Sequence, residues 1–308
     1  MNMKDWQSIL KLIIRTGMGL FFILSAVLKL ISLDQFELYI YSFNILNFIW
    51  SGLAARMIIA CEILVGILLI IKVKYKPAWW LTFLMLVGFS FLLVYVILFR
   101  DDTNCHCMGE LIEIKPSFSL AKNILCIVLM FIIRKEDDYH FRGSKLAFGL
   151  AIAAALIPSF VLFPMDNVYN LFSKSGNKEF NETAFNRLMA DSAMQTVHLD
   201  DGNYIVGVIL AGCQYCHTSA IKISEMASNN QLDTNRILFF ASGNSATLKQ
   251  FQNETHTETF RFIPIDPVTA IKIVNGHFPT YLFLKNGYVT ESADLRQLTE
   301  KKVKVHLQ

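Results

Sequence analysis

The chain has 308 residues, of which 54% are hydrophobic and 17% charged, and its formal net charge is +3. Soluble proteins are about 45–50% apolar, so the excess predicts that part of this chain lies in lipid. The apolar blocks end near residue 164, whereas residues 165–308 have the composition of a globular domain. Because this second part contains no run of Lys and Arg, we expect no nucleic-acid partner.

Five segments are apolar enough to cross a bilayer core, which takes about 20 residues of helix. They are residues 10–31, 48–71, 79–98, 118–133 and 146–163. The first is too long for a cleavable signal peptide and is followed by no small-x-small cleavage site, so we expect it to be retained. These features predict a multi-pass protein of the lipid bilayer.

The charges of the connecting segments predict how the spans are oriented. Lys and Arg gather in the N-terminal flank and in the second and fourth connections, near Lys11, Lys74 and Arg134. Such segments stay in the cytoplasm, whereas the connections 32–47 and 100–117 have few basic residues and face outward. An odd number of spans carries the globular part to the outer side. We therefore expect a bacterial inner (plasma) membrane protein with a cytoplasmic N-terminus and a periplasmic C-terminal domain.

An acidic residue, Glu62, lies near the middle of the second span. An ionised carboxylate is costly there and indicates a functional site. It either serves a proton path or quinone binding, or forms a structural ion pair. Arg56 lies six residues earlier, about 240° round the helix, and is a poor same-face partner. Arg15, Lys29 and Lys122 of other spans are the candidate partners.

Two cysteines, Cys105 and Cys107, follow the third span in the sequence DDTNCHCMGE. A C-x-C pair can close a small strained disulfide that exchanges readily with thiols. The alternatives are an inert structural disulfide and half of a metal site that includes His106. We expect redox exchange and no metal. The remaining membrane cysteines, Cys61 and Cys126, are expected to be small buried apolar residues.

The CHCMG sequence resembles the C-x-C-x-G motif of the DoxX-like family, specifically its methylamine utilisation MauE branch. RTGMGLFFILSAVLKL in the first span, CEILVG in the second and SLAKNILCIV at the start of the fourth are also similar to that family. The resemblance covers about residues 13–134. It implies a four-helix membrane domain, which we assign to residues 1–140, with a role in disulfide formation or maturation of exported proteins. A fifth helix, within residues 141–166, lies outside this bundle and would be a tether.

The second cysteine pair, Cys213 and Cys216, lies in AGCQYCH between an apolar run typical of a buried strand, 204–210, and a segment typical of a helix, 217–227. A helix N-terminus stabilises a thiolate there. We expect Cys213 to attack disulfides and Cys216 to resolve the mixed disulfide. CQYCH also fits c-type haem attachment with His217 as ligand. The β-like run before the motif favours the redox pair, so no covalently bound cofactor is expected.

The segment GHFPTYLFLKNG resembles the part of thioredoxin in which a cis-proline precedes a strand and a hairpin. The resemblance covers about residues 179–303 and implies an α/β thioredoxin-like domain, which we assign to residues 167–308. It also implies that Phe278 and Pro279 contact the substrate.

Three features depart from thioredoxin. Gly212 replaces the tryptophan that usually precedes the first cysteine, and Gly207 replaces the buried acid that usually accepts the proton of the second. The redox potential of thioredoxin therefore does not carry over to this pair. The long spacing between Cys216 and Pro279 predicts inserted structure around residues 229–259.

Together these features predict a membrane-bound thiol–disulfide oxidoreductase. It would relay electrons between the C-x-C membrane module and the C-x-x-C domain, and act on exported client proteins with thiols or disulfides. Oxidation of clients requires an electron acceptor such as a quinone, whereas reduction requires a donor on the cytoplasmic side. The sequence does not determine the direction of electron flow. The alternatives are a non-catalytic assembly module that binds exported proteins and a c-type haem carrier.

Overall fold

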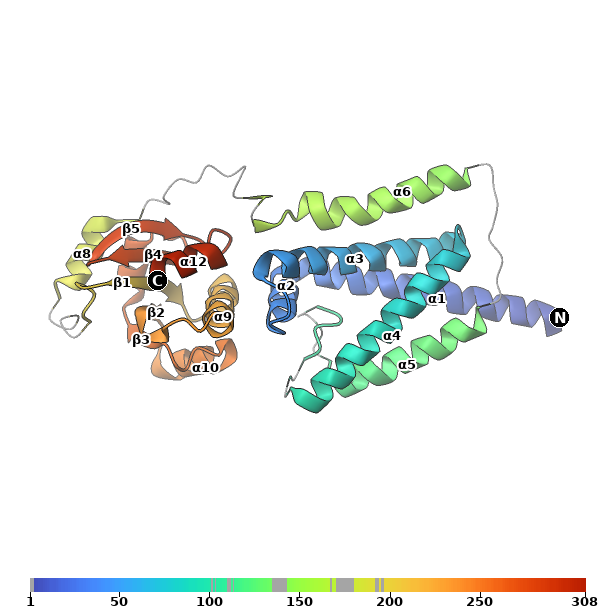
Figure 1. Cartoon of the computed structure of the whole chain (residues 1–308), viewed down its shortest axis with the longest axis horizontal. Coiled ribbons are helices and arrows are strands. Elements are labelled where there is room, and N and C mark those ends of the chain that lie inside the picture. Colours follow the sequence, from blue (N-terminus) through green and yellow to red (C-terminus); the bar gives the residue numbers. More distant parts are fainter. Residues whose placement is uncertain are drawn as a thin grey trace. The chain divides into compact units, whose positions relative to one another are not determined.

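The computed structural model describes residues 3–308 except 101, 103, 110–111, 113, 135–142, 167, 170–179, 192–193 and 195–196. The chain divides into two compact units (Figure 1): Met1–Ile40 with Ile49–Met165, and Tyr41–Phe48 with Asp166–Gln308. We call the first the membrane unit and the second the globular unit. The predicted domain boundary between residues 140 and 141 lies outside the described residues, as does residue 167.

The membrane unit consists of long helices, and each of the five predicted spans forms one. The helices are α1 (Met3–Ile31), α2 (Leu33–Tyr41), α3 (Phe48–Ile71), α4 (Tyr75–Phe99), α5 (Pro116–Ile132) and α6 (Ser144–Leu156), which continues as the π-helical turn η1 (Ile157–Leu162). Within the described residues, four helices have the length and hydropathy of a membrane span, whereas α5 is apolar but shorter. The chain is therefore a membrane protein, as predicted. The short helix α2 was not predicted.

Small residues and side-chain donors hold the membrane helices together. A Cβ atom on Gly19 of α1 would lie 2.7 Å from the carbonyl oxygen of Gly66 in α3, so only glycine permits this close approach. Helices α4 and α5 lie side by side (Figure 1). There Trp79 donates to the carbonyl oxygen of Met130 at 2.7 Å. Carbonyl groups in the last turn of a helix have no intrahelical partner, so this bond satisfies one that would otherwise be unpaired in lipid.

The fifth predicted helix, α6 with η1, packs against the other membrane helices. Ala155 of α6 packs in a buried cluster with residues of α1 and α3. Arg56 of α3 donates to the carbonyl oxygens of Phe163 and Pro164, at 3.0 and 3.2 Å, immediately after η1. The same guanidinium forms a buried ion pair with Glu37 at 2.8 Å. These bonds satisfy the carbonyls that end the fifth helix, and they make this helix part of the membrane unit.

The globular unit is a mixed sheet covered by helices. The strands are β1 (Asn203–Leu210), β2 (Ile237–Ser242), β3 (Arg261–Pro264), β4 (Thr280–Lys285) and β5 (Tyr288–Ala293), and the described helices are α8 (Glu182–Met189), α9 (Gln214–Asn229), η3 (Thr234–Arg236), α10 (Ser245–Thr255), α11 (Pro267–Ile273) and α12 (Glu300–Leu307). The strand order is β3-β2-β1-β4-β5. Strands β1, β2 and β3 run parallel, whereas β4 is antiparallel to both β1 and β5. A parallel βαβ part followed by an antiparallel hairpin is the thioredoxin-like arrangement, so the predicted fold class is confirmed.

One prediction about this domain was partly wrong. The range 229–259, expected to be inserted structure, contains η3, β2 and α10. Strand β2 pairs with both β1 and β3 and is fully buried, so it belongs to the central sheet and is not an insertion. The sequence FFAS in β2 lacks the alternation of a half-exposed strand because both of its faces are covered.

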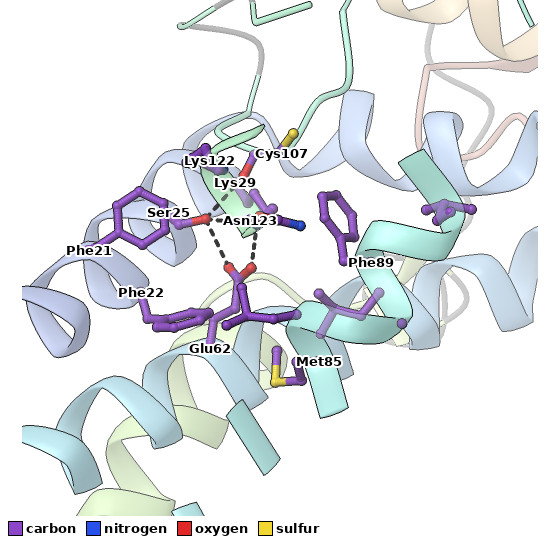
Figure 2. A pocket seen from close by; sticks show the side chains of 14 residues that line it. Phe21, Phe22, Ser25, Lys29, Glu62, Met85, Phe89, Cys107, Lys122 and Asn123 are labelled. Carbon is purple, nitrogen blue, oxygen red and sulfur yellow. Dashed lines mark hydrogen bonds and ion pairs between the residues drawn. The ribbon is translucent and has the colours of Figure 1, made fainter. Parts of the chain in front are cut away.

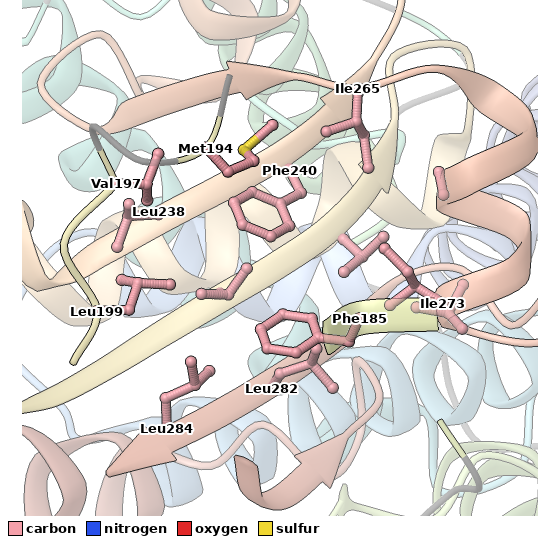
Figure 3. Close-up of a cluster of buried hydrophobic side chains, with 14 residues drawn as sticks. Phe185, Met194, Val197, Leu199, Leu238, Phe240, Ile265, Ile273, Leu282 and Leu284 are labelled. Atoms are coloured by element: carbon pink, nitrogen blue, oxygen red, sulfur yellow. The ribbon is translucent and has the colours of Figure 1, made fainter. Parts of the chain in front are cut away.

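The main core lies between one face of the sheet and helices α8 and α11 (Figure 3). Phe185 of α8 stacks on Phe240 of β2 with a centroid distance of 6.3 Å. Asn181 is the N-cap residue of α8, and its side chain accepts a hydrogen bond from Ala184 N at 3.0 Å. This cap starts the helix where its apolar face can meet the sheet. Helix α9, which carries the C-x-x-C pair, packs with α10. Strand β1 ends three residues before the first cysteine of that pair, Cys213.

Candidate functional site

Cys213 is the N-cap residue of α9 and follows the end of β1. Its sulfur accepts a hydrogen bond from the backbone N–H of Cys216 at 3.2 Å. The first N–H groups of a helix have no intrahelical acceptor and carry the positive end of the helix dipole. The Cys213 sulfur therefore lies at the end of the helix where free N–H groups point, and its side chain is only partly buried.

Cys216 lies one turn further into α9 and differs from Cys213 in its surroundings. It is fully buried, and burial raises the pKa of its thiol well above the usual value, with the hydrogen bond to Cys213 acting in the same direction. Near neutral pH this thiol stays protonated. Of the two sulfurs, only that of Cys213 is thus accessible from outside the domain.

The peptide bond between Phe278 and Pro279 is cis, as the thioredoxin resemblance implies. Pro279 is buried next to β4, whose first residue, Thr280, pairs with Val208 of β1. Phe278 is partly buried and packs against the core of Figure 3. Contact of Phe278 and Pro279 with a substrate remains a prediction.

A hydroxyl pair lies beneath the cysteines, in the region where thioredoxin has a buried acid. The hydroxyl of Tyr281 donates to Ser219 Oγ at 3.0 Å, and Ser219 donates to the carbonyl oxygen of Cys216 at 2.8 Å. Tyr281 is completely buried, and its burial raises the pKa of the phenol. Neither hydroxyl belongs to the C-x-x-C motif, so the sequence alone did not indicate them.

Gly207 leaves room for these aromatic rings. A Cβ atom at this position would lie 2.9 Å from Tyr281 Cε1 and 3.0 Å from Phe239 Cδ1. Both rings are anchored in the sheet, so they cannot move aside without distortion. The absence of an acid at Gly207 therefore has a packing reason.

We predict that Gly207→Ala lowers the free energy of unfolding of the globular unit by about 1–3 kcal/mol, because overpacking forces rings or backbone to shift. Urea-dependent pulse proteolysis of the full chain in nanodiscs measures this. Gly212→Ala is the matched control, since a Cβ there meets nothing within 4 Å. Equal urea midpoints for the two variants would contradict this explanation.

His217 follows the second cysteine and lies in the first turn of α9. Its Nε2 is 3.4 Å from a carboxylate oxygen of Glu254, and its ring makes an edge contact with Phe251, both in α10. Through these two contacts the His217 side chain links α9 to α10.

Cys105 and Cys107 form a disulfide in the loop between α4 and α5 of the membrane unit, with a Cα–Cα distance of 5.3 Å. Both are buried, and they pack in a cluster with Leu93. The Cys107 sulfur is 2.6 Å from Ser119 Oγ at the start of α5. Among the described residues, no group of three or more His, Cys, Asp or Glu side chains is placed to hold a metal ion.

Glu62 forms a buried ion pair with Lys29 of α1, with 2.5 Å between Oε1 and Nζ. Lys29 was one of three partners considered from the sequence. Ser25 lies beside the pair, accepts from Lys29 at 2.9 Å and has its hydroxyl 3.0 Å from the carbonyl oxygen of Cys107. Arg56 is engaged elsewhere, with Glu37, as its position on the helix predicts. The intramembrane carboxylate is thus connected through polar groups to the C-x-C loop.

The fold and the two cysteine pairs define a membrane protein in which a helical bundle precedes a thioredoxin-like domain. Residues 7–134 match the family model described as methylamine utilisation protein MauE, which confirms the predicted resemblance. The chain is 24% identical to Protein TlpB of Flavobacterium psychrophilum in an alignment that covers 92% of this chain and 91% of the relative. Among solved structures it is similar to a secreted Mycobacterium tuberculosis disulfide oxidoreductase homologous to E. coli DsbE, at 11% identity and a TM-score of 0.30, over 36% of this chain and 84% of that one.

Proposed function

We propose that this chain is a membrane-bound thiol–disulfide oxidoreductase that acts on exported proteins. The observation that supports it best is the contrast between the two sulfurs of the C-x-x-C pair. Cys213 is accessible at the N-terminus of α9, whereas Cys216 is buried with its backbone N–H bonded to the Cys213 sulfur. One sulfur can attack a client, and the other can only resolve the product.

The exchange reaction involves only the Cys213/Cys216 pair and its client, and it has two steps. The Cys213 thiolate attacks a client disulfide, forms a mixed disulfide and releases one client thiolate. Cys216 then loses its proton and attacks the Cys213 sulfur, which releases the second client thiolate and leaves a Cys213–Cys216 disulfide. The client gains two electrons. The reverse sequence introduces a disulfide into a client with two thiols.

The finer proposal is that the membrane unit renews the redox state of this pair. The Cys105–Cys107 disulfide can accept two electrons from the Cys213/Cys216 dithiol by the same exchange chemistry, which leaves a disulfide in the globular unit. The distribution of Lys and Arg in the connections supports a periplasmic location for both pairs in a bacterial inner membrane.

A direct test uses the purified full chain in nanodiscs, reduced and freed of reductant, with a disulfide-bonded model protein as client. Thiol release from the client is followed over time. Because a serine hydroxyl cannot replace the thiolate nucleophile, we expect Cys213→Ser to lower the rate at least about 100-fold. Cys61→Ser, which changes a free cysteine of α3, is expected to leave the rate unchanged. A Cys213→Ser variant with the wild-type rate would overturn the proposed function.

A further inference from the structure

The membrane unit contains a cavity of about 370 Å³ formed by α1, α3, α4 and α5 (Figure 2). Most of its lining is apolar, and three aromatic rings, Phe21, Phe22 and Phe89, contribute to it. Pockets for small organic ligands have volumes of about 300–1,000 Å³ and combine an apolar lining with a few polar groups. The size and lining of this cavity suit a compact, mostly apolar ligand.

A group of polar side chains lies in the same cavity. Lys29 and Glu62 form their ion pair there, and Ser25 bonds to Lys29. An ammonium group has three hydrogens, and the two bonds described for Lys29 use two of them. The polar part can therefore donate a hydrogen bond to a ligand oxygen without losing its internal ion pair.

Asn123 of α5 is a second donor in this cavity. Asn123 is 2% exposed, and its side-chain amide nitrogen has no hydrogen-bond partner among the described residues. A buried amide N–H without an acceptor is unfavourable in a membrane interior, where water does not replace the missing partner. Because Asn123 lines the cavity, a ligand with a carbonyl oxygen would supply that acceptor.

The cavity adjoins the C-x-C disulfide. Cys107 is one of its lining residues, and the carbonyl oxygen of Cys107 lies 3.0 Å from the Ser25 hydroxyl. Phe89 lines the cavity and also packs against the buried cluster of Cys105 and Cys107. A ligand in this space lies beside a group that stores two electrons when it is reduced.

We propose that the cavity binds a lipid-soluble quinone, with Asn123 and Lys29 donating hydrogen bonds to its carbonyl oxygens, and that this quinone oxidises the Cys105/Cys107 dithiol. A quinone has the required flat apolar ring and two carbonyl acceptors, and it dissolves in the bilayer that surrounds the membrane unit. This inference rests on the proposed function, because it names the electron acceptor of the same relay.

In the reduced protein, the two S–H bonds of Cys105 and Cys107 break and an S–S bond forms between the two sulfurs. Two electrons and two protons pass to the quinone, whose carbonyl oxygens become the hydroxyl groups of a quinol. The network of Ser25, Lys29 and Glu62 connects the C-x-C loop to the cavity and is placed to carry the protons.

The test measures reduction of a short-chain quinone, decylubiquinone, by the pre-reduced full chain in nanodiscs made without quinone. The wild-type protein is expected to reduce it, as followed by ultraviolet absorbance. Asn123→Leu removes the amide donor but keeps an apolar side chain of similar size, and we expect it to raise the KM for decylubiquinone at least about 10-fold. Ser159→Ala, a buried change in η1 outside the cavity, is the control and is expected to leave the KM unchanged.

Two results would overturn the inference. One is a wild-type protein that exchanges thiols with its client but does not reduce decylubiquinone. The other is an equal KM in wild type and Asn123→Leu, with phospholipid alone recovered from the purified protein by mass spectrometry. Client exchange is measured on the same samples. Loss of quinone reduction with intact client exchange rejects the quinone site alone, whereas loss of client exchange in wild type rejects the proposed function.

Discussion

A Cys216→Ser variant is expected to accumulate mixed disulfides between Cys213 and exported proteins in cells. The backbone N–H of Cys216 bonds to the Cys213 sulfur, and the Cys216 thiol is buried. Replacing Cys216 by serine leaves the attacking sulfur of Cys213 intact and removes the resolving sulfur. We expect resolution to slow at least about 100-fold, because only external thiols then release the client. Non-reducing electrophoresis followed by mass spectrometry detects the adducts.

The matched control is Cys213→Ser, which is expected to form no adducts because the accessible sulfur is lost. Cys126→Ser, a buried membrane cysteine outside both pairs, is expected to behave as wild type. If Cys216→Ser yields no adducts and clients instead co-purify noncovalently, the chain is an assembly module that holds exported proteins.

A Cys105→Ser variant is expected to shift the Cys213/Cys216 pair in cells from mainly disulfide to mainly dithiol. The C-x-C disulfide cannot form without Cys105, so the globular unit can no longer pass its electrons to the membrane unit. Each turnover with a client dithiol then leaves Cys213 and Cys216 reduced. Acid quenching followed by alkylation with a mass-tagged maleimide measures the fraction of each state.

Cys61→Ser is the control for this shift, since Cys61 is a free cysteine of α3 that belongs to neither pair. It is expected to show the wild-type fraction of disulfide. An unchanged redox state of Cys213 and Cys216 in Cys105→Ser would mean that another oxidant renews the pair.

Local patterns were enough to predict most of the fold. Continuous apolar runs predicted the five membrane helices, and the change from a β-like run to a helical pattern located Cys213 at the start of α9. Both of these patterns are formed by residues that are close together in the sequence. The position of Glu62 in a span also predicted a buried polar partner, because a carboxylate in lipid must find one.

Contacts between distant segments could not be predicted in the same way. The choice of Lys29 as the partner of Glu62, and of Glu37 as the partner of Arg56, depends on how the helices are rotated and shifted against each other. Gly207 was read only as a missing acid, because the rings that fill its place come from β2 and β4. The cavity likewise forms only when four helices have packed.

The central claim is that the two cysteine pairs exchange electrons within one chain. The most direct test uses nanodiscs that hold single chains of two double variants, Cys105→Ser/Cys216→Ser and Cys107→Ser/Cys216→Ser, oxidised mildly and digested for mass spectrometry. We expect at least one variant to yield a peptide in which Cys213 is disulfide-linked to the remaining cysteine of the C-x-C pair. If neither variant yields this peptide while Cys213 in the same samples still forms adducts with a client, the relay between the two pairs is contradicted.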